Sequence, residues 1–126
     1  IIKINGMRHP WEKVALWRVE SRGELRGVIM VDNVKGKARP ITYLVAFESA
    51  GAIHAMEVLA YRESHGGEVR SPLFLDQFAE KSHDDALTVG KDIRNVSGAT
   101  ISSRALTRGA HALASYMHYL IAEKKL

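Results

Sequence analysis

The stretch Ser97-Gly98-Ala99-Thr100-Ile101-Ser102-Ser103 stands directly before a long helical pattern and divides that pattern from the rest of the chain. Small and hydroxylated side chains fill the stretch, and Gly98 permits the positive φ angle that a tight turn requires. We expect Ser102 or Ser103 to cap the first free amides of the helix. Exposed amides at a helix start favour a phosphate, and Thr100 places a hydroxyl where that phosphate would sit. The stretch therefore predicts a phosphate-binding turn.

The helix that follows is predicted from the spacing of its apolar residues. Between Ser103 and Lys124, apolar side chains recur every three or four residues, which is typical of one face of an amphipathic helix. This face consists of Ala105, Leu106, Ala110, Leu113, Ala114, Met117, Leu120 and Ile121. The chain is thus expected to end in one long helix.

The part of the chain before residue 62 reads as strands joined by tight turns. Apolar and β-branched runs at 13–20, 25–35, 41–48 and 52–61 are separated by turn-forming residues. This repeated order of strand, turn and strand predicts an antiparallel meander. Residues 1–12 are expected to be an extended or irregular lead-in.

Shorter elements are expected between the meander and the helix. Residues 64–71 are rich in glycine and polar side chains and predict a loop, whereas Pro72 opens a short helix over 72–78. Residues 82–85 are a polar linker, and 87–89 are expected to form a short edge strand. The fold class is therefore α+β: an antiparallel β-sheet meander packed by a long C-terminal helix and a short helix, in a single domain over 1–126.

Length and composition exclude several classes of function. A chain of 126 residues forms one domain and buries about two-thirds of its unfolded surface. The net charge is +4, but the basic residues are scattered and form no helix face with interleaved aromatics, so nucleic-acid binding is not expected. With no cysteine, disulfides, thiolate clusters and thiol catalysis are excluded. No metal-ligand cluster, signal peptide or membrane-spanning apolar stretch of about 18 residues is present.

Two motifs carry a family resemblance. The sequence S-G-A-T-I-S-S at 97–103 resembles the flavinylation motif Ser/Thr-Gly-Ala-Thr-x-Ser/Thr-Ser of the FMN-binding domain family. The segment Y-R-E-S-H-G-G-E-V-R at 61–70, followed by F-L-D-Q-F at 74–78, resembles that family's loop before its Gln-Phe helix. The family includes flavin-carrying subunits of the sodium-pumping quinone reductase and Rnf complexes, and the likeness is closest to nitrous-oxide-reductase-regulator and stand-alone members. It covers roughly residues 24 to 120.

The resemblance implies a covalent flavin and the residues that hold it. In the family, a flavin transferase joins FMN through its phosphate to the last threonine of the motif, here Thr100. The family often has an aspartate six residues earlier, where this chain has Arg94, flanked by Asp92 and Asn95. The implied cofactor-binding residues are Thr100, Ser97, Gly98, Ala99, Ser102, Glu63, His65, Gly66, Gly67, Leu73 and Phe74.

Some of these side chains have a second interpretation. Glycines at 66 and 67 let the backbone approach a planar ring, and an imidazole donor near the ring would tune its electronics, but the same residues also suit a plain turn. Leu73 and Phe74 either cover the isoalloxazine or belong to the core between helix and sheet. Arg94, Arg104 and Arg108 offer guanidinium groups to the phosphodiester, although arginines spaced by four on a helix are more often simply solvated.

The resemblance implies an electron carrier rather than a stand-alone enzyme. FMN would supply the chemistry, and a covalent tether makes its binding an intramolecular event. The implied redox partners are membrane-bound proteins, and the implied location is extracytoplasmic, with a leader or anchor removed. Two alternatives stay open. One is a flavin- or redox-sensing module that regulates a membrane partner, and the other is an enzyme with Ser97 or Thr100 as nucleophile and His65 as base.

Overall fold

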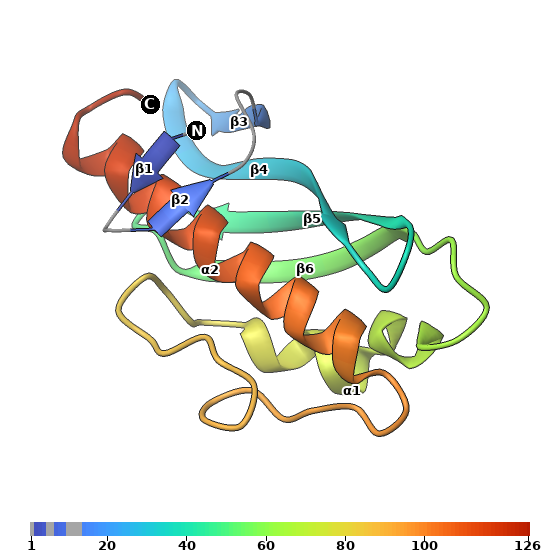
Figure 1. The fold of residues 1–126 in the computed structure, drawn as a ribbon. Coiled ribbons are helices and arrows are strands. Elements are labelled where there is room, and N and C mark those ends of the chain that lie inside the picture. Colours follow the sequence, from blue (N-terminus) through green and yellow to red (C-terminus); the bar gives the residue numbers. More distant parts are fainter. Residues whose placement is uncertain (1, 5–6, 10–13) are drawn as a thin grey trace.

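The computed structural model describes residues 2–4, 7–9 and 14–126, and its main layer is a four-stranded antiparallel sheet (Figure 1). The strands are β3 (Ala15–Ser21), β4 (Glu24–Lys35), β5 (Pro40–Glu48) and β6 (Ile53–Ala60), and they pair in chain order. The predicted meander is therefore confirmed.

Strand β5 shows why the sheet has one buried face. Its residues alternate strictly between buried and half-buried after the exposed Pro40, as expected for a strand with a period of two. The buried set is Ile41, Tyr43, Val45 and Phe47, which register opposite Val34, Asp32, Met30 and Val28 of β4. These residues form the side of the core that faces the long helix.

That helix, α2 (Thr100–Ala122), crosses the buried face of the sheet obliquely (Figure 1). It lies close to the sheet at Gly109, where an added Cβ would collide with the phenol of Tyr43 and come within 2.8 Å of Val34 Cγ1. The Tyr43 hydroxyl donates to Asp32 at 3.3 Å, and burial raises the pKa of this phenol well above its ordinary value. The predicted C-terminal helix is confirmed, and it begins at Thr100.

Short helices cover the end of the sheet beside the start of α2. They are η1 (Gly67–Arg70), α1 (Pro72–Leu75) and η2 (Asp76–Phe78). Pro72 stands in the first turn of α1, and the Ser71 hydroxyl accepts the amide of Leu73 at 3.2 Å as its N-cap. The short helix predicted over 72–78 is thus present, whereas part of the predicted loop at 64–71 is the 3-10 turn η1, because Val69 is fully buried and anchors it.

The prediction of an edge strand at 87–89 is wrong. Val89 makes only an isolated bridge with Ile93, and the amides of Leu87 and Thr88 donate instead to the Asp92 carboxylate at 2.9 and 3.0 Å. A side chain therefore satisfies the backbone groups that a neighbouring strand would have bonded.

The expected lead-in is partly described. It contains a two-stranded antiparallel pair, β1 (Ile2–Ile4) and β2 (Met7–His9), of which β1 contacts α2. The rest of the lead-in, at positions 1, 5–6 and 10–12, lies outside the described residues.

Candidate functional site

A glycine turn leads the chain into α2. The Ala99 amide donates to the Val96 carbonyl at 3.0 Å, which closes a four-residue turn with Gly98 at its third position. Gly98 has a φ of 80°, and an added Cβ would find open space there, so the backbone angle and not crowding favours glycine. Ala99 occupies the N-cap position and provides no side-chain hydrogen bond. The prediction that Ser102 or Ser103 caps this helix is wrong.

Both serines bind elsewhere. The Ser103 hydroxyl donates to the Ala99 carbonyl at 2.7 Å and accepts the Val96 amide at 3.4 Å, so it stabilises the turn from inside the helix. The Ser102 hydroxyl lies 2.9 Å from the Tyr61 hydroxyl, which also donates to the His65 carbonyl. These contacts join the 61–66 segment to the first turn of α2.

Gly66 packs between Tyr61 and the first turn of α2. It is buried and has a φ of 84°, and an added Cβ would collide with the Tyr61 hydroxyl and lie 3.3 Å from Ser102 Oγ. Any other residue would be strained by both the backbone angle and the neighbouring side chains. Glycine at position 66 is therefore required by the packing of the site.

The first turn of α2 leaves backbone donors available. The Ser103 amide is the first to make a helical bond, to the Ala99 carbonyl at 2.8 Å. Helix geometry leaves the preceding amides of Thr100, Ile101 and Ser102 without intrahelical acceptors, and no acidic side chain stands in this turn. Together with the positive end of the helix dipole, these amides favour an anion such as a phosphate.

The Thr100 side chain is exposed and held in place by one neighbour. Its hydroxyl accepts a hydrogen bond from Asn95 Nδ2 at 3.0 Å. The backbone before Asn95 is fixed in turn by Gln77, whose amide accepts the Arg94 N–H at 2.6 Å and donates to the Arg94 carbonyl at 3.3 Å. Sequence reasoning gave Gln77 and Asn95 no role, and the only signal was their position within or beside the two motifs.

Two hollows lie at the site, and Thr100 lines the first. The Thr100 hollow, of about 390 Å³, is lined by Lys37, Tyr61, Glu63, His65, Gly66, Gly98, Ala99, Thr100, Ile101 and Ser102. The Leu73 hollow, of about 570 Å³, is lined by Glu68, Ser71, Leu73, Phe74, Gln77, Arg94, Asn95 and Val96. Asn95 links them, because it lines the second hollow and bonds the threonine of the first. Of the residues expected at the site, Ser97 and Gly67 line neither hollow.

Glu63 supports a neighbouring turn. Its carboxylate accepts the amides of Ala38 and Arg39 at 2.7 and 2.9 Å, which fixes the connection between β4 and β5. The hydrogen bond from the Ala38 amide, followed by that from Arg39, lowers the pKa of Glu63 below its ordinary value of 4.5. This carboxylate therefore shapes the wall of the Thr100 hollow through the backbone that it holds.

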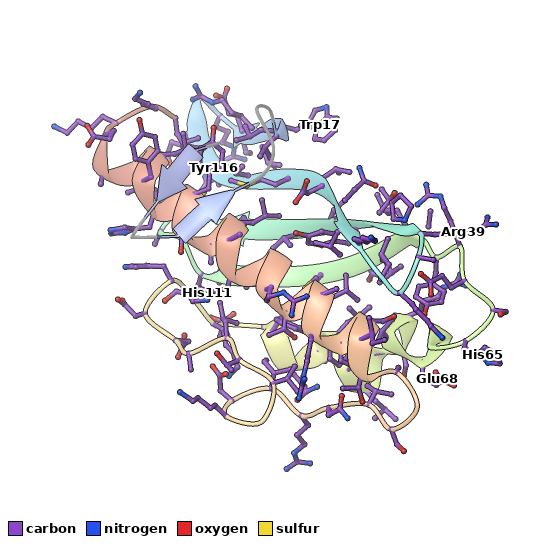
Figure 2. All side chains as sticks on the ribbon, viewed as in Figure 1. Trp17, Arg39, His65, Glu68, His111 and Tyr116 are labelled. Atoms are coloured by element: carbon purple, nitrogen blue, oxygen red, sulfur yellow. The ribbon has the colours of Figure 1, made fainter. Side chains whose placement is uncertain are left out.

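His65 is exposed at the end of the molecule where α2 begins, and Figure 2 shows it there together with Arg39 and Glu68. It lines the same hollow as Thr100. Among the described residues, however, the hydrogen bond recorded for the Thr100 hydroxyl comes from Asn95. His65 and Thr100 are therefore not hydrogen-bonded to each other, and the structure does not support the alternative of a histidine-activated nucleophile.

Leu73 and Phe74 have opposite surroundings although they are adjacent. Phe74 is 1% exposed and packs edge-on against Phe78 with ring centroids 5.4 Å apart, so it belongs to the core. Leu73 is 90% exposed beside the hollow that bears its name. Of the two, only Leu73 has an open face for a bound ring.

The three arginines are divided between two places. Arg94 lines the Leu73 hollow, whereas Arg104 and Arg108 line a third hollow farther along α2. The described residues contain no group of three or more side chains suited to a metal ion. In the same part of the chain, we find no helical segment with the length and apolarity needed to span a bilayer.

The sequence and the fold of the chain match known proteins. Residues 36–115 match the model of a family described as FMN-binding domain. The chain is similar to one component of the Na(+)-translocating ferredoxin:NAD(+) oxidoreductase complex of Acetobacterium woodii, with 28% identity over 116 residues that cover 84% of this chain and 56% of the relative. Its fold resembles that of NqrC from Shewanella oneidensis, with a TM-score of 0.66 at 22% identity over 85% of this chain and 60% of the other. The chain thus spans a little over half the length of each.

Proposed function

Because the chain belongs to the FMN-binding domain family, we propose that it is an electron-transfer domain whose FMN is attached through its phosphate to the Thr100 hydroxyl. One observation carries the proposal. Thr100 is exposed in a helix turn without a side-chain cap, it lines one hollow, and its hydrogen-bond partner Asn95 lines a second. A hydroxyl in this position is accessible to a large donor molecule and stands beside amides that favour phosphate.

The residues present suit the group. The amides of Thr100, Ile101 and Ser102 have no intrahelical acceptors and would bind the phosphate, and Gly66 lets Tyr61 pack against Ser102 in one wall of the Thr100 hollow. The Leu73 hollow, at about 570 Å³, lies within the range of about 300 to 1,000 Å³ usual for small-molecule sites. It offers the exposed Leu73 for one face of an aromatic ring and Arg94 as a cation. Bound FMN supplies the redox chemistry, and the protein supplies its position and electrostatic surroundings.

Attachment requires a donor with an activated FMN phosphate, for which FAD has the right chemistry. The bond between Thr100 Oγ1 and phosphorus forms while the phosphoanhydride bond breaks, AMP leaves, and the hydroxyl proton passes to a base. Asn95 donates to Oγ1 at 3.0 Å, which leaves the hydroxyl proton free to point away from Asn95. A flavin transferase would supply the base and orient the donor.

The name of the relative from Acetobacterium woodii supports membrane-bound redox partners. That relative belongs to a Na(+)-translocating oxidoreductase complex, and this chain would exchange electrons with proteins of similar kind. A covalent flavin is suited to an extracytoplasmic location, because a cofactor lost there is not readily replaced. The tether makes rebinding intramolecular and so prevents that loss.

Mass spectrometry of the intact chain tests the attachment. Protein produced together with a flavin transferase is expected to gain the mass of one FMN less one water, and its pellet after denaturing precipitation is expected to stay yellow. Thr100→Ala should abolish both signals, whereas Thr100→Ser, which keeps the hydroxyl, should retain them. An unmodified mass and a colourless pellet in the wild-type chain would contradict the proposal.

A further inference from the structure

The first half of α2 is buried on every side but one. Between residues 100 and 111, the exposed side chains are Thr100, Ile101, Arg104 and Arg108, and His111 is half-buried, while the others are covered. Thr100, Arg104, Arg108 and His111 recur at spacings of four, four and three, so they share one face of the helix. We call this face the exposed stripe, and it carries two guanidinium groups beyond Thr100.

A hollow lies beside the exposed stripe. This basic hollow, of about 340 Å³, is lined by Leu87, Thr88, Val89, Arg104, Thr107, Arg108 and His111. Figure 2 shows His111 near the middle of α2, on the side of the long segment that leads into the helix. The wall opposite the helix is held in shape because the Asp92 carboxylate binds the amides of Leu87 and Thr88. The hollow therefore lies between α2 and a loop whose shape is fixed by Asp92.

The charges of the basic hollow are not balanced within it. None of its lining residues is an aspartate or a glutamate, and no ion pair within the described part of the chain includes Arg104 or Arg108. Each guanidinium thus keeps its planar donors available, in the geometry that binds a carboxylate through two hydrogen bonds. The net charge of +4 adds a long-range attraction for acidic molecules.

We propose that the basic hollow is a docking site for an acidic segment of a redox partner protein, in which aspartate or glutamate side chains pair with Arg104 and Arg108. This inference rests on the proposed electron-transfer function. The helical rise places Arg104 about 6 Å and Arg108 about 12 Å from Thr100 along the axis. A partner bound there lies against the edge of the flavin site. Two cations about one helical turn, or about 6 Å, apart along the axis can each pair with a separate carboxylate of an acidic segment.

Peptide binding to the full chain tests the docking site. The probe is hexaglutamate at low ionic strength, with hexaglutamine as the uncharged comparison, and binding is followed by NMR and by fluorescence anisotropy. We expect amide shifts at 87–89 and 104–111, and an affinity that falls as salt screens the charges. The double variant R104E/R108E should bind hexaglutamate at least tenfold more weakly. Both side chains are exposed, so this variant is expected to fold.

A control variant separates this site from net charge alone. R22E/K124E changes the charge by the same amount at two exposed positions, in the β3–β4 turn and after the end of α2, and should weaken binding less than twofold. An equal loss in both variants, shifts confined to other regions, or no binding by the wild-type chain would overturn the proposal.

Two further probes separate a partner protein from other anions. Inorganic phosphate that competes as well as hexaglutamate, or phosphatidylglycerol vesicles that bind with the same dependence on Arg104 and Arg108, would also overturn the proposal. The measurement needs no flavin, so its failure is distinct from failure of attachment at Thr100.

Discussion

The middle of α2 is packed tightly against the sheet, whereas its first turn is partly exposed. At the middle, Gly109 brings the helix backbone against Tyr43, and Leu106 and Leu113 are fully buried. At the first turn, Thr100 is exposed and the helix has no side-chain cap. Packing against the sheet therefore explains the middle, whereas packing alone leaves the first turn unexplained. The middle of this helix thus supports the fold, and its first turn is the place of the proposed flavin attachment.

The first turn is supported by polar contacts instead. Gln77 holds the Arg94 backbone, Asn95 holds the Thr100 hydroxyl, and Tyr61 meets Ser102. These contacts join segments far apart in the chain, yet none of them lies between the sheet and the middle of α2. Changes to them should affect the site more than the fold, and three substitutions can test this separation.

The largest effect on stability is expected for Gly109→Val. A side chain here meets the Tyr43 phenol and Val34, so overpacking should lower the free energy of unfolding by about 3 kcal/mol, as measured by urea denaturation. In the control Arg108→Val, valine stands on the exposed face of the helix and should lower the free energy of unfolding by less than about 1 kcal/mol. Flavin attachment per folded molecule should not change in Gly109→Val. Wild-type stability in this variant would show that the close approach to Tyr43 is unimportant.

A smaller effect on stability and a larger one on attachment are expected for Gln77→Ala. Loss of its two hydrogen bonds to Arg94 should lower the free energy of unfolding by about 1 to 2 kcal/mol. Attachment at Thr100 should slow about tenfold, because Asn95 loses its fixed position. Asn95→Ala should slow attachment similarly while changing stability by about 0.5 kcal/mol, since its side chain is exposed. Time courses with excess transferase measure the rate, and wild-type rates in both variants would contradict this role.

The smallest effect is expected for the pH dependence of the melting temperature in Glu63→Gln. The hydrogen bonds from the Ala38 and Arg39 amides hold the folded-state pKa of Glu63 below 4.5. These bonds therefore add stability at pH values above the unfolded-state pKa, and this added stability is lost as the pH falls through the folded-state pKa. The difference in melting temperature between wild type and Glu63→Gln should therefore shrink between about pH 6 and pH 3. A difference in melting temperature that stays constant over this pH range for Glu63→Gln would rule out this linkage.

The sequence predicted what depends on local periodicity. Alternation in β5 and apolar spacing in α2 are local patterns, and both elements are present. The predicted cap failed because Ser103 bonds back to Ala99 within its own helix and Ser102 meets Tyr61, 41 residues away in the chain. The Gln77 contacts with Arg94 were missed for the same reason, because nothing in the spacing reveals a bond across 17 residues.

The wrong prediction of an edge strand at 87–89 has the same cause, because it used only the residues within that stretch. Leu87 and Thr88 looked like strand residues, but the carboxylate that satisfies their amides follows them in the chain at Asp92. The motif predicted Thr100 as a site residue, whereas the hollow that Thr100 lines and the hollow that Asn95 lines became visible only once three separate segments had been placed together.

The rigid entry of Thr100 into α2 restricts how an attached cofactor can move. A swinging arm, such as a flexible loop, would let a flavin travel between donor and acceptor. A flavin attached to a threonine in the first turn of a helix of 23 residues, closely packed at Gly109, would have only the torsions of that side chain and of its own linker. Under the proposed attachment, donor and acceptor would therefore visit the same stationary flavin in turn, or approach it from its two sides.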